Sequence, residues 1–577
     1  MSPISEKERK IILEFCHLLE KSKQLFNGLR ELTPYGNKQW QAHFGRTFDI
    51  YAKLWKFQQQ YRPILDLRYG LKRWQIGEIA SKIGQLYYHF YLRTSEIAYL
   101  VEAFSFYLAI RGRQYYNLAS KEAKSELMVK KLRYYARFIV VAILLRQSEI
   151  INELLIELEK QIVAYGQAYD PNDQAEWLNV LEEVRAFLNA DPGVTILDPD
   201  NNNRIVTLSG RLSRHTIPSI ERTLQMNLKL QDAIIIGSGT QLVKFSELTI
   251  DMFRMLQNLE WEIDVPIKDP SVDSPHASGE TSKTPKRIGV PCAGGNVNPH
   301  KYLLFKPSAC QVVTYVASTI NELPQKGVLL IFISADGYHP HQNTHPENYT
   351  YDIGGLITSS KSDIYRDYNR ETKSVNSKYK NKHILYPGDL QPFTRKPLVI
   401  IVDSDNSYAF QHISRTFGLP LLVLMSPLSL PGTINDRSTQ GSLFTLFLHN
   451  SIAGLCNSCE VFTINLETWE KCSHLRDVFM KEAVRLLMRT RVDPTYHAFL
   501  GCEFLRLMIL RYIFCECTLR LHRGFRARTN LPRASPPLPD ELIENCDLMS
   551  IIVDIADCIG VREYFYDPSA PGTAPRD

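Results

Sequence analysis

The front of the chain, residues 6–190, carries the hydrophobic spacing of α-helices. Apolar residues recur three and four positions apart from Ile11 to Leu29, and this spacing places them on one face of a helix. The run 139–145 is almost entirely apolar, which predicts a central, buried helix. Prolines are rare in this region, and a turn signal at 170–173 separates its last two predicted helices. We therefore predict an all-helical array over 6–190.

Within this array, residues 103–109 set small side chains beside large aromatic ones at helical spacing. This pattern resembles a tetratricopeptide hairpin, but the roughly 34-residue period of that repeat does not recur. The prediction is therefore a set of helical hairpins that is tetratricopeptide-like at best.

From about residue 194, short β-rich runs alternate with helical stretches. Five apolar runs predict buried strands, over 233–236, 302–305, 328–333, 398–402 and 421–424. Helices are expected over 308–323 and 407–417. Continuous apolar strands separated by helices are typical of a parallel sheet covered on both faces. The fold class is therefore α/β multi-domain, with a doubly wound, Rossmann-like domain over 194–440 and a C-terminal helical region over 441–577.

Two polar segments interrupt the predicted α/β domain, over 268–298 and 358–383. Neither has an apolar period, so both are expected to be mobile insertions. The first contains the minimal proline-directed phosphorylation sites Ser274-Pro275 and Thr284-Pro285. A phosphate there adds nearly two negative charges and could pair with the basic front of the chain.

Charge is distributed unevenly along the chain. Residues 1–150 hold 25 Lys and Arg against 13 Asp and Glu, a surplus of 12, whereas residues 151–190 hold 2 against 8. The basic front also contains 25 of the 61 aromatic residues. A basic, aromatic-rich surface suits nucleic acid or an acidic partner. Solvated cations around an aromatic helical core would give the same composition.

Five cations in the basic front form the predicted partner-binding surface: Arg111, Arg113, Lys130, Arg133 and Arg137. The first two are expected at the end of one helix. The last three follow at i, i+3 and i+7, so they share a face of the next helix. The intervening Tyr134 and Tyr135 can pack inward. Such a face would attract an acidic activation segment or a phosphate backbone, with an affinity that falls as salt rises.

Asp403 and Asp405 follow a predicted strand directly, at the edge where open α/β sheets place their ligands. Two carboxylates at this spacing can hold Mg²⁺, which prefers oxygen ligands. Hydrolases and nucleic-acid enzymes that use such a pair also need distant partners, and none is identified in this sequence. The alternative is that one of the two carboxylates caps the helix expected at 407.

Three further patterns are weak. Gly237-Ser238-Gly239 resembles half of a dinucleotide fingerprint, but the third glycine position holds Leu242; a tight strand-to-helix turn is the alternative. Clustered histidines and cysteines could bind Zn²⁺, although buried thiols would explain the cysteines equally well. The candidate ligands are His339, His341 and His345 in one cluster and Cys456, Cys459, Cys472 and His474 in the other.

The composition, with 44% hydrophobic and 22% charged residues, excludes a mainly disordered chain, a collagen-like fibre and a polytopic membrane protein. Eleven cysteines at irregular spacing indicate a reducing compartment, and no signal peptide is predicted. Residues 442–459 carry no formal charge but are too polar for a stable membrane span. We expect no catalytic residues, no cofactor and no bound metal.

Five stretches carry a resemblance to a known family. They read EFCHLLEKSKQLFNGLR at 14–30, YGNKQWQ at 35–41, FGRTF at 44–48, EAFSFY at 102–107 and LVIIVDSDNS at 398–407. These stretches resemble the SCAI family, the suppressor of cancer cell invasion proteins. The resemblance covers most of the chain, and the two polar insertions and the tail after 560 diverge from it.

The resemblance implies a regulatory role. It implies a transcriptional corepressor and scaffold in nucleus and cytoplasm that represses serum response factor targets through the myocardin-related coactivator. Such a protein opposes Rho–actin signalling and cell migration. Two alternatives stay open: a genome-maintenance adaptor in double-strand-break repair that contacts DNA or repair proteins, and an enzyme that uses Asp403 and Asp405.

Overall fold

The computed structural model describes residues 5–36, 39–116, 125–169, 171–201, 204–206, 209–220, 227–239, 242–262, 297–339, 353–360, 382–432, 434 and 437–567. The chain divides into two compact units. The helical unit comprises residues 1–181 and 263–298, and the sheet unit comprises 182–262 and 299–577. The two predicted insertions lie largely outside the described residues, as do both phosphorylation sites.

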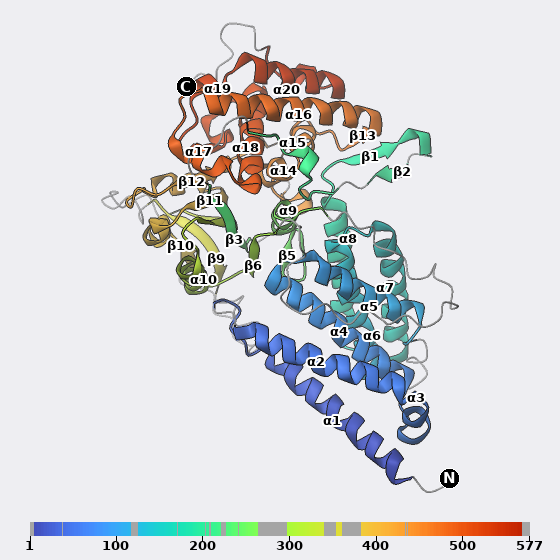
Figure 1. The fold of residues 1–577 in the computed structure, drawn as a ribbon. Helices are drawn as coiled ribbons and strands as arrows, with labels where there is room; N and C mark the ends of the chain where they lie inside the picture. The colour runs from blue at the N-terminus through green and yellow to red at the C-terminus, as the bar shows by residue number, and fades with distance from the viewer. Residues whose placement is uncertain are drawn as a thin grey trace, which may run out of the picture. The chain divides into compact units, whose positions relative to one another are not determined.

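The helical prediction for the front of the chain is confirmed (Figure 1). The helices are α1 (Glu6–Gly28), α2 (Gln39–Gln60), α3 (Arg62–Ile64), α4 (Arg73–Thr94), α5 (Ile97–Gly112), α6 (Ser125–Leu144), α7 (Ser148–Tyr169) and α8 (Gln174–Ala190). They pack as hairpins, α1 on α2, α4 on α5 and α6 on α7. The tetratricopeptide likeness is not confirmed.

Helix α6 is the central helix that the apolar run 139–145 predicted. Its residues Phe138 and Ile139 have no exposed surface. The Phe138 ring lies 5.5 Å from the ring of Phe104 and 5.7 Å from that of Tyr107, both on α5. Aromatic rings therefore fill the space between these helices, as the composition of the basic front indicated.

The sheet unit is built on six strands in the order β14-β12-β11-β7-β3-β6. They are β3 (Lys229–Gly237), β6 (His300–Phe305), β7 (Gly327–Ser334), β11 (Leu398–Asp403), β12 (Leu421–Met425) and β14 (Arg533–Ser535). The first five are parallel and contain the five predicted apolar runs, whereas β14 pairs antiparallel with β12. Every residue of the central strands β7 and β11 is buried.

The Rossmann-like part of the prediction is not confirmed. Numbered along the chain, the parallel strands lie in the order 2-1-3-4-5, whereas the Rossmann order is 3-2-1-4-5-6. Two short strands, β4 (Lys244–Phe245) and β5 (Leu248–Thr249), also separate β3 from helix α9 (Ile250–Asn258). The predicted strand-to-helix turn at 237–239 is therefore wrong.

The helix predicted over 308–323 is present as α10 (Ala309–Glu322), with Ser308 as its N-cap. The helix predicted over 407–417 is wrong: only a 3-10 turn, η7 (Ser407–His412), forms. The Ser407 hydroxyl donates to the carbonyl of Ser426, 19 residues further along the chain, and this bond ties the start of the segment to the residue that follows β12.

Two small sheets complete the strands of the sheet unit. One contains β8 (Gly337–Tyr338), β9 (Gly355–Ser360) and β10 (Lys382–Leu385), and the other contains β1 (Thr195–Asp198), β2 (Arg204–Val206) and β13 (Thr463–Asn465). Because β13 and β14 pair with strands that precede residue 441, the C-terminal region belongs to the same compact unit as the main sheet.

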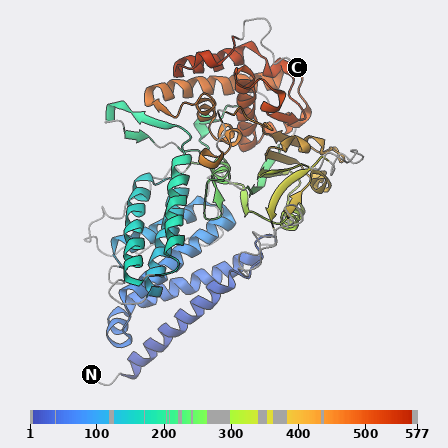
Figure 2. The same ribbon diagram turned by 180° about the vertical axis from the view of Figure 1, so that it is seen from behind.

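The remaining helices are mostly C-terminal: α12 (Pro387–Leu390), α13 (Arg437–Gln440), α14 (Leu443–His449), α15 (Ser451–Ser458), α16 (Leu466–Arg489), α17 (Pro494–Leu500), α18 (Glu503–Leu521), α19 (Asp540–Ile543) and α20 (Cys546–Ile559). Helices α16 and α20 lie side by side, orange and red in both views (Figure 2). The uncharged stretch 442–459 forms the buried helices α14 and α15, separated at Asn450. Within the described residues, no helix has the length and apolar character needed to cross a membrane.

Candidate functional site

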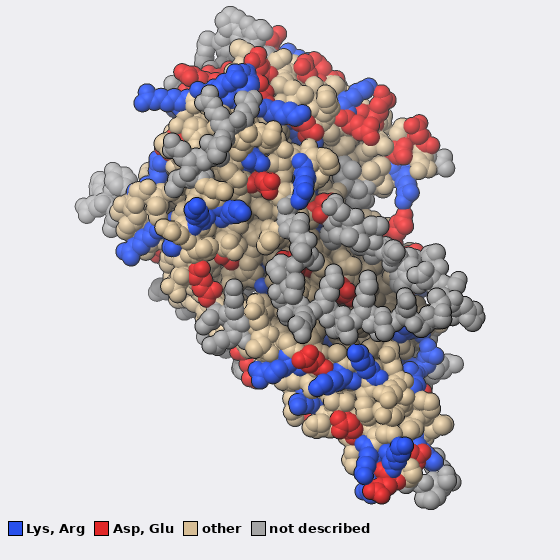
Figure 3. Space-filling view, viewed as in Figure 1, with Lys and Arg blue, Asp and Glu red and all other residues tan. Residues whose placement is uncertain are grey.

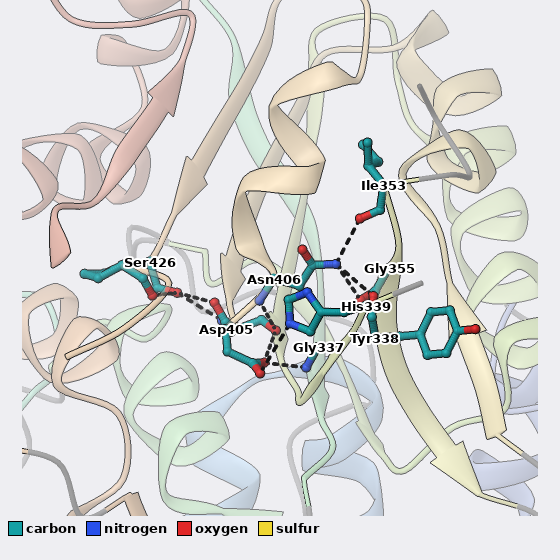
Figure 4. Close-up of polar contacts among 10 residues, drawn as sticks. Gly337, Tyr338, His339, Ile353, Gly355, Asp405, Asn406 and Ser426 are labelled. Atoms are coloured by element: carbon teal, nitrogen blue, oxygen red, sulfur yellow. Dashed lines mark hydrogen bonds and ion pairs between the residues drawn. The ribbon is translucent and has the colours of Figure 1, made fainter. Parts of the chain in front are cut away.

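The two carboxylates after β11 do not converge on one point. Asp403 is fully buried, and its Oδ2 accepts a 2.6 Å hydrogen bond from the Thr445 hydroxyl. Asp405 is 57% exposed, and its Oδ1 accepts a 2.6 Å hydrogen bond from the Gly337 amide of β8 (Figure 4). One side chain therefore stabilises the interior and the other holds a neighbouring strand.

Asn406 completes this connection between the main sheet and the β8–β9 pair. Its side-chain amide donates to the carbonyls of Tyr338, Ile353 and Gly355 (Figure 4). No side chain caps η7, so the alternative in which Asp403 or Asp405 caps a helix is also wrong. Asp405 and Asn406 bind the chain's own backbone, and Asp403, the last residue of β11, binds the Thr445 hydroxyl. These contacts give all three residues a structural role.

The glycines after β3 allow other side chains to come close. A Cβ at Gly237 would lie 2.4 Å from the sulfur of Met252, and one at Gly239 would lie 2.9 Å from the Leu242 side chain. The Ser238 amide donates to the Ser334 carbonyl. Close packing therefore accounts for these two glycines.

Neither predicted Zn²⁺ cluster is assembled in the part of the chain that is described. His339 is 59% exposed, and its Nε2 lies 3.7 Å from Asp405 Oδ2; His341 and His345 lie outside the described residues. Burial raises the pKa of the Cys459 and Cys472 thiols to about 12. Among the described residues, no three His, Cys, Asp or Glu side chains form a metal-binding group.

Two of the five predicted partner-binding cations are paired within the helical unit. The Arg111 guanidinium lies 2.7 Å from Glu153 and 2.6 Å from Glu157, both on α7. The Lys130 ammonium lies 3.4 Å from Glu78 and 3.3 Å from Glu126. These carboxylates neutralise both cations and hold α5, α6 and their neighbours together.

The other three predicted cations have no such carboxylate among the described residues. Arg113 is exposed at the end of α5, donates to the Tyr115 hydroxyl and accepts a bond from Arg73 at its carbonyl. Arg133 is exposed and Arg137 is half-buried. Tyr134 and Tyr135 between them are buried as predicted, and the Tyr134 hydroxyl donates to the carbonyl of Tyr107.

Arg133 and Arg137 lie in a larger group of basic side chains, which we call the cationic cluster. Its members are Arg30, Lys82, His89, Arg133 and Arg137. Burial, together with Arg137 and Arg30, lowers the pKa of Lys82 to about 8. Burial and four surrounding cations, Arg137 first, lower the pKa of His89 to about 4. Burial is the larger cause in both cases, and the smaller effects of the neighbouring cations show that the five basic groups are near enough to interact electrostatically.

The sequence did not identify Arg30, Lys82 and His89 as members of a site. They come from the end of α1 and from α4, far from α6 in sequence, so only the packing of the helices brings them to Arg137. The i, i+7 spacing of Lys82 and His89 was the one available signal, since it puts both on one face of α4. On the face seen in Figure 3, acidic side chains lie among the Lys and Arg over α1 and α2. The cationic cluster therefore differs from other basic parts of the surface in having few neighbouring carboxylates among the described residues, and not in its number of cations.

Comparison with known proteins gives a consistent result over most of the chain. The family model "Protein SCAI" matches residues 17–525. The curated Protein SCAI of Mus musculus is 48% identical over 569 residues, which are 98% of this chain and 91% of that protein. Protein SCAI of Homo sapiens is 48% identical over 567 residues, with the same coverage. A Protein SCAI homolog of Dictyostelium discoideum is 32% identical over 710 residues, covering 98% and 92%.

Proposed function

This chain belongs to the SCAI family, and on that premise we propose that it is a non-enzymatic transcriptional corepressor and scaffold. In this proposal it inhibits transcription by serum response factor and its myocardin-related coactivator, in nucleus and cytoplasm, and so opposes Rho–actin signalling and cell migration. The observation that carries the proposal is the near full-length similarity to the curated SCAI proteins.

The geometry after β11 supports a role without catalysis. An enzyme of the type considered for Asp403 and Asp405 needs both carboxylates aimed at one metal or substrate. Asp403 instead bonds Thr445 in the interior, and Asp405 bonds the backbone of Gly337. We therefore assign these residues to the fold.

A reporter assay in cells depleted of their own SCAI protein tests the proposal. Expression of this chain is expected to lower transcription from a promoter with serum response factor sites. A matched promoter with those sites mutated is the control and should not respond. Co-precipitation of the coactivator with the chain should accompany repression. Equal effects on both promoters would contradict the proposed role.

The surplus of 12 positive charges in residues 1–150 also favours a second candidate, an adaptor in double-strand-break repair that touches DNA. Cations without carboxylate partners are available to phosphates, and such contacts weaken steeply as salt rises. Binding of a DNA duplex by the purified chain, measured across a salt series, separates this candidate from the first.

A further inference from the structure

We propose that the cationic cluster is a docking site for a short, carboxylate-rich peptide segment of a partner protein. The inference rests on the proposed function only in that a scaffold must hold a partner. It is tested with purified protein, so its outcome is independent of the reporter assay.

The cluster combines a half-buried floor with an exposed rim. Lys82 and His89 on α4 are half-buried, whereas Arg30 and Arg133 are exposed. The Lys82 ammonium lies 4.4 Å from the centroid of the Phe26 ring, and the His89 ring lies 6.0 Å from the same ring. Lys82 and His89 of α4 thus lie beside the Phe26 ring of α1, and cations from the end of α1 and from α6 act electrostatically on both.

The cluster lacks compensating negative charge. Among the described residues, Glu78 is the carboxylate that raises the pKa of Lys82, and it also lies 3.4 Å from the Lys130 ammonium. Within the described part of the chain, no Asp or Glu forms an ion pair with Arg30, Arg133 or Arg137. Like charges held together in a partly desolvated place destabilise the free protein. A bound anion removes that repulsion, so the fold itself favours occupancy by negative charge.

The extent of the cluster favours a peptide over a nucleic-acid backbone. A nucleic acid needs a continuous track of cations along its phosphates. Here Lys130, one turn before Arg133 on α6, is already neutralised by Glu78 and Glu126. Carboxylates on flexible side chains can also reach the half-buried Lys82 and His89, which the phosphates of a wide duplex reach poorly.

The charges that face Lys82 and His89 fix the direction of the pH effect. Burial first, and then Arg137, Arg30 and Arg133, lower the pKa of Lys82 to about 8, while Glu78 acts in the opposite direction. Around His89, the cations are Arg137, Lys82, Arg30 and Arg93. A bound carboxylate favours the charged forms and raises both pKa values. Affinity should therefore fall as pH rises through about 8, because Lys82 then loses its positive charge.

The first experiment measures binding of a labelled Glu-Ser repeat peptide of about twelve residues to the full chain by fluorescence anisotropy, with a Gln-Ser repeat as the uncharged control. The variant R133E/R137E is expected to weaken binding at least tenfold, about 1.4 kcal/mol or more. The matched control K53E/K56E makes the same charge change at two exposed positions of α2 and should weaken binding less than about twofold. Equal losses in both variants would overturn the proposal, because they would show a response to net charge alone.

The second experiment measures how many protons the protein takes up when the peptide binds. Calorimetry at pH 8 in two buffers of different ionisation enthalpy should show proton uptake on peptide binding. K82R keeps a cation at this position but does not titrate in this range, so it should retain affinity and lose most of that uptake. Unchanged uptake in K82R overturns the assignment to Lys82. Tighter binding of a single-stranded oligonucleotide of equal charge than of the peptide overturns the choice of partner.

Discussion

At the scale of single residues, the two units differ in how their charged side chains are paired. In the sheet unit, the fully buried Glu260 lies 3.0 Å from Arg211 and 3.7 Å from Lys301, and all three side chains are almost inaccessible. Such an arrangement balances charge where water is excluded. In the helical unit, the basic groups of the cationic cluster are exposed or half-buried, and they are not arranged around a central carboxylate as Arg211 and Lys301 are. The pairing of each cation, which sequence alone does not reveal, decides its role.

Asp232 on β3 allows a pH-dependent test of what a half-buried carboxylate costs in stability when no cation among the described residues compensates it. Burial, and secondarily Glu322, raises the pKa of Asp232 to about 6. At pH 7 Asp232 is therefore ionised in both the folded and the unfolded state, but its negative charge is less favourable in the folded state. D232N should raise the free energy of unfolding at pH 7 by at most about 3 kcal/mol.

The advantage of D232N should shrink as pH falls through about 6 and vanish below about 4, where Asp232 is protonated in both states. Denaturant unfolding at a series of pH values checks this, with the exposed Asp554→Asn of α20 as the control expected to show little change. A gain from D232N that persists undiminished at pH 4 would show that the carboxylate charge is not the cause.

At the scale of elements, long helices and buried strands could be predicted because their signals are local. The apolar run at 398–402 forms a strand buried throughout, and the periodic run before Leu29 forms most of α1. The helix expected over 407–417 failed because Ser407 bonds the carbonyl of Ser426 on the neighbouring chain segment. That competing partner is distant in sequence, and no periodicity in the chain indicates it.

The α4–α5 hairpin depends on a close approach at Gly77. A Cβ at this position would lie 2.8 Å from the Cβ of Tyr115, which follows α5 and cannot move away without its backbone. G77A should therefore lower the free energy of unfolding by about 1–2 kcal/mol, the cost of overpacking less the helix-propensity gain.

The matched control for G77A is G45A, since no atom lies within 4 Å of a Cβ built at Gly45 of α2. Alanine there should be neutral or stabilising by up to about 1 kcal/mol. Thermal and denaturant unfolding of both variants, followed by circular dichroism, gives the comparison. Equal stability of the two variants would mean that the end of α5 does not pack on α4 as closely as described.

At the scale of the whole molecule, the change from helical to α/β pattern was evident in the sequence, but the distribution of the candidate site was not. The five predicted cations fall within residues 111–137, so they can be found by reading the sequence. Two of these cations, Arg133 and Arg137, belong to the cationic cluster. The cluster also contains residues of α1 and α4, which come near α6 only when the three helices pack together. Long-range packing of this kind leaves no periodic trace in a single sequence.

The division into units also crosses a helix, and this gives a last prediction. Although α8 ends at Ala190, its residues from Glu182 onward belong to the sheet unit. The Phe187 ring packs 5.4 Å from that of Phe253, and the fully buried Arg254 donates a 2.7 Å bond to the Ala190 carbonyl. The end of α8 thus completes the packing of α9.

We therefore expect a fragment 182–577 to be folded and a fragment 191–577 to be less stable by at least about 3 kcal/mol, since it loses a buried Phe and a buried hydrogen-bond acceptor. A fragment 1–190 should show a helical circular dichroism spectrum and a cooperative melt. A shorter fragment, 1–181, should melt similarly but self-associate less, because it does not expose Phe187. Equal stability of 182–577 and 191–577 would place the boundary after α8 and would show that Phe187 and Ala190 contribute nothing to the sheet unit.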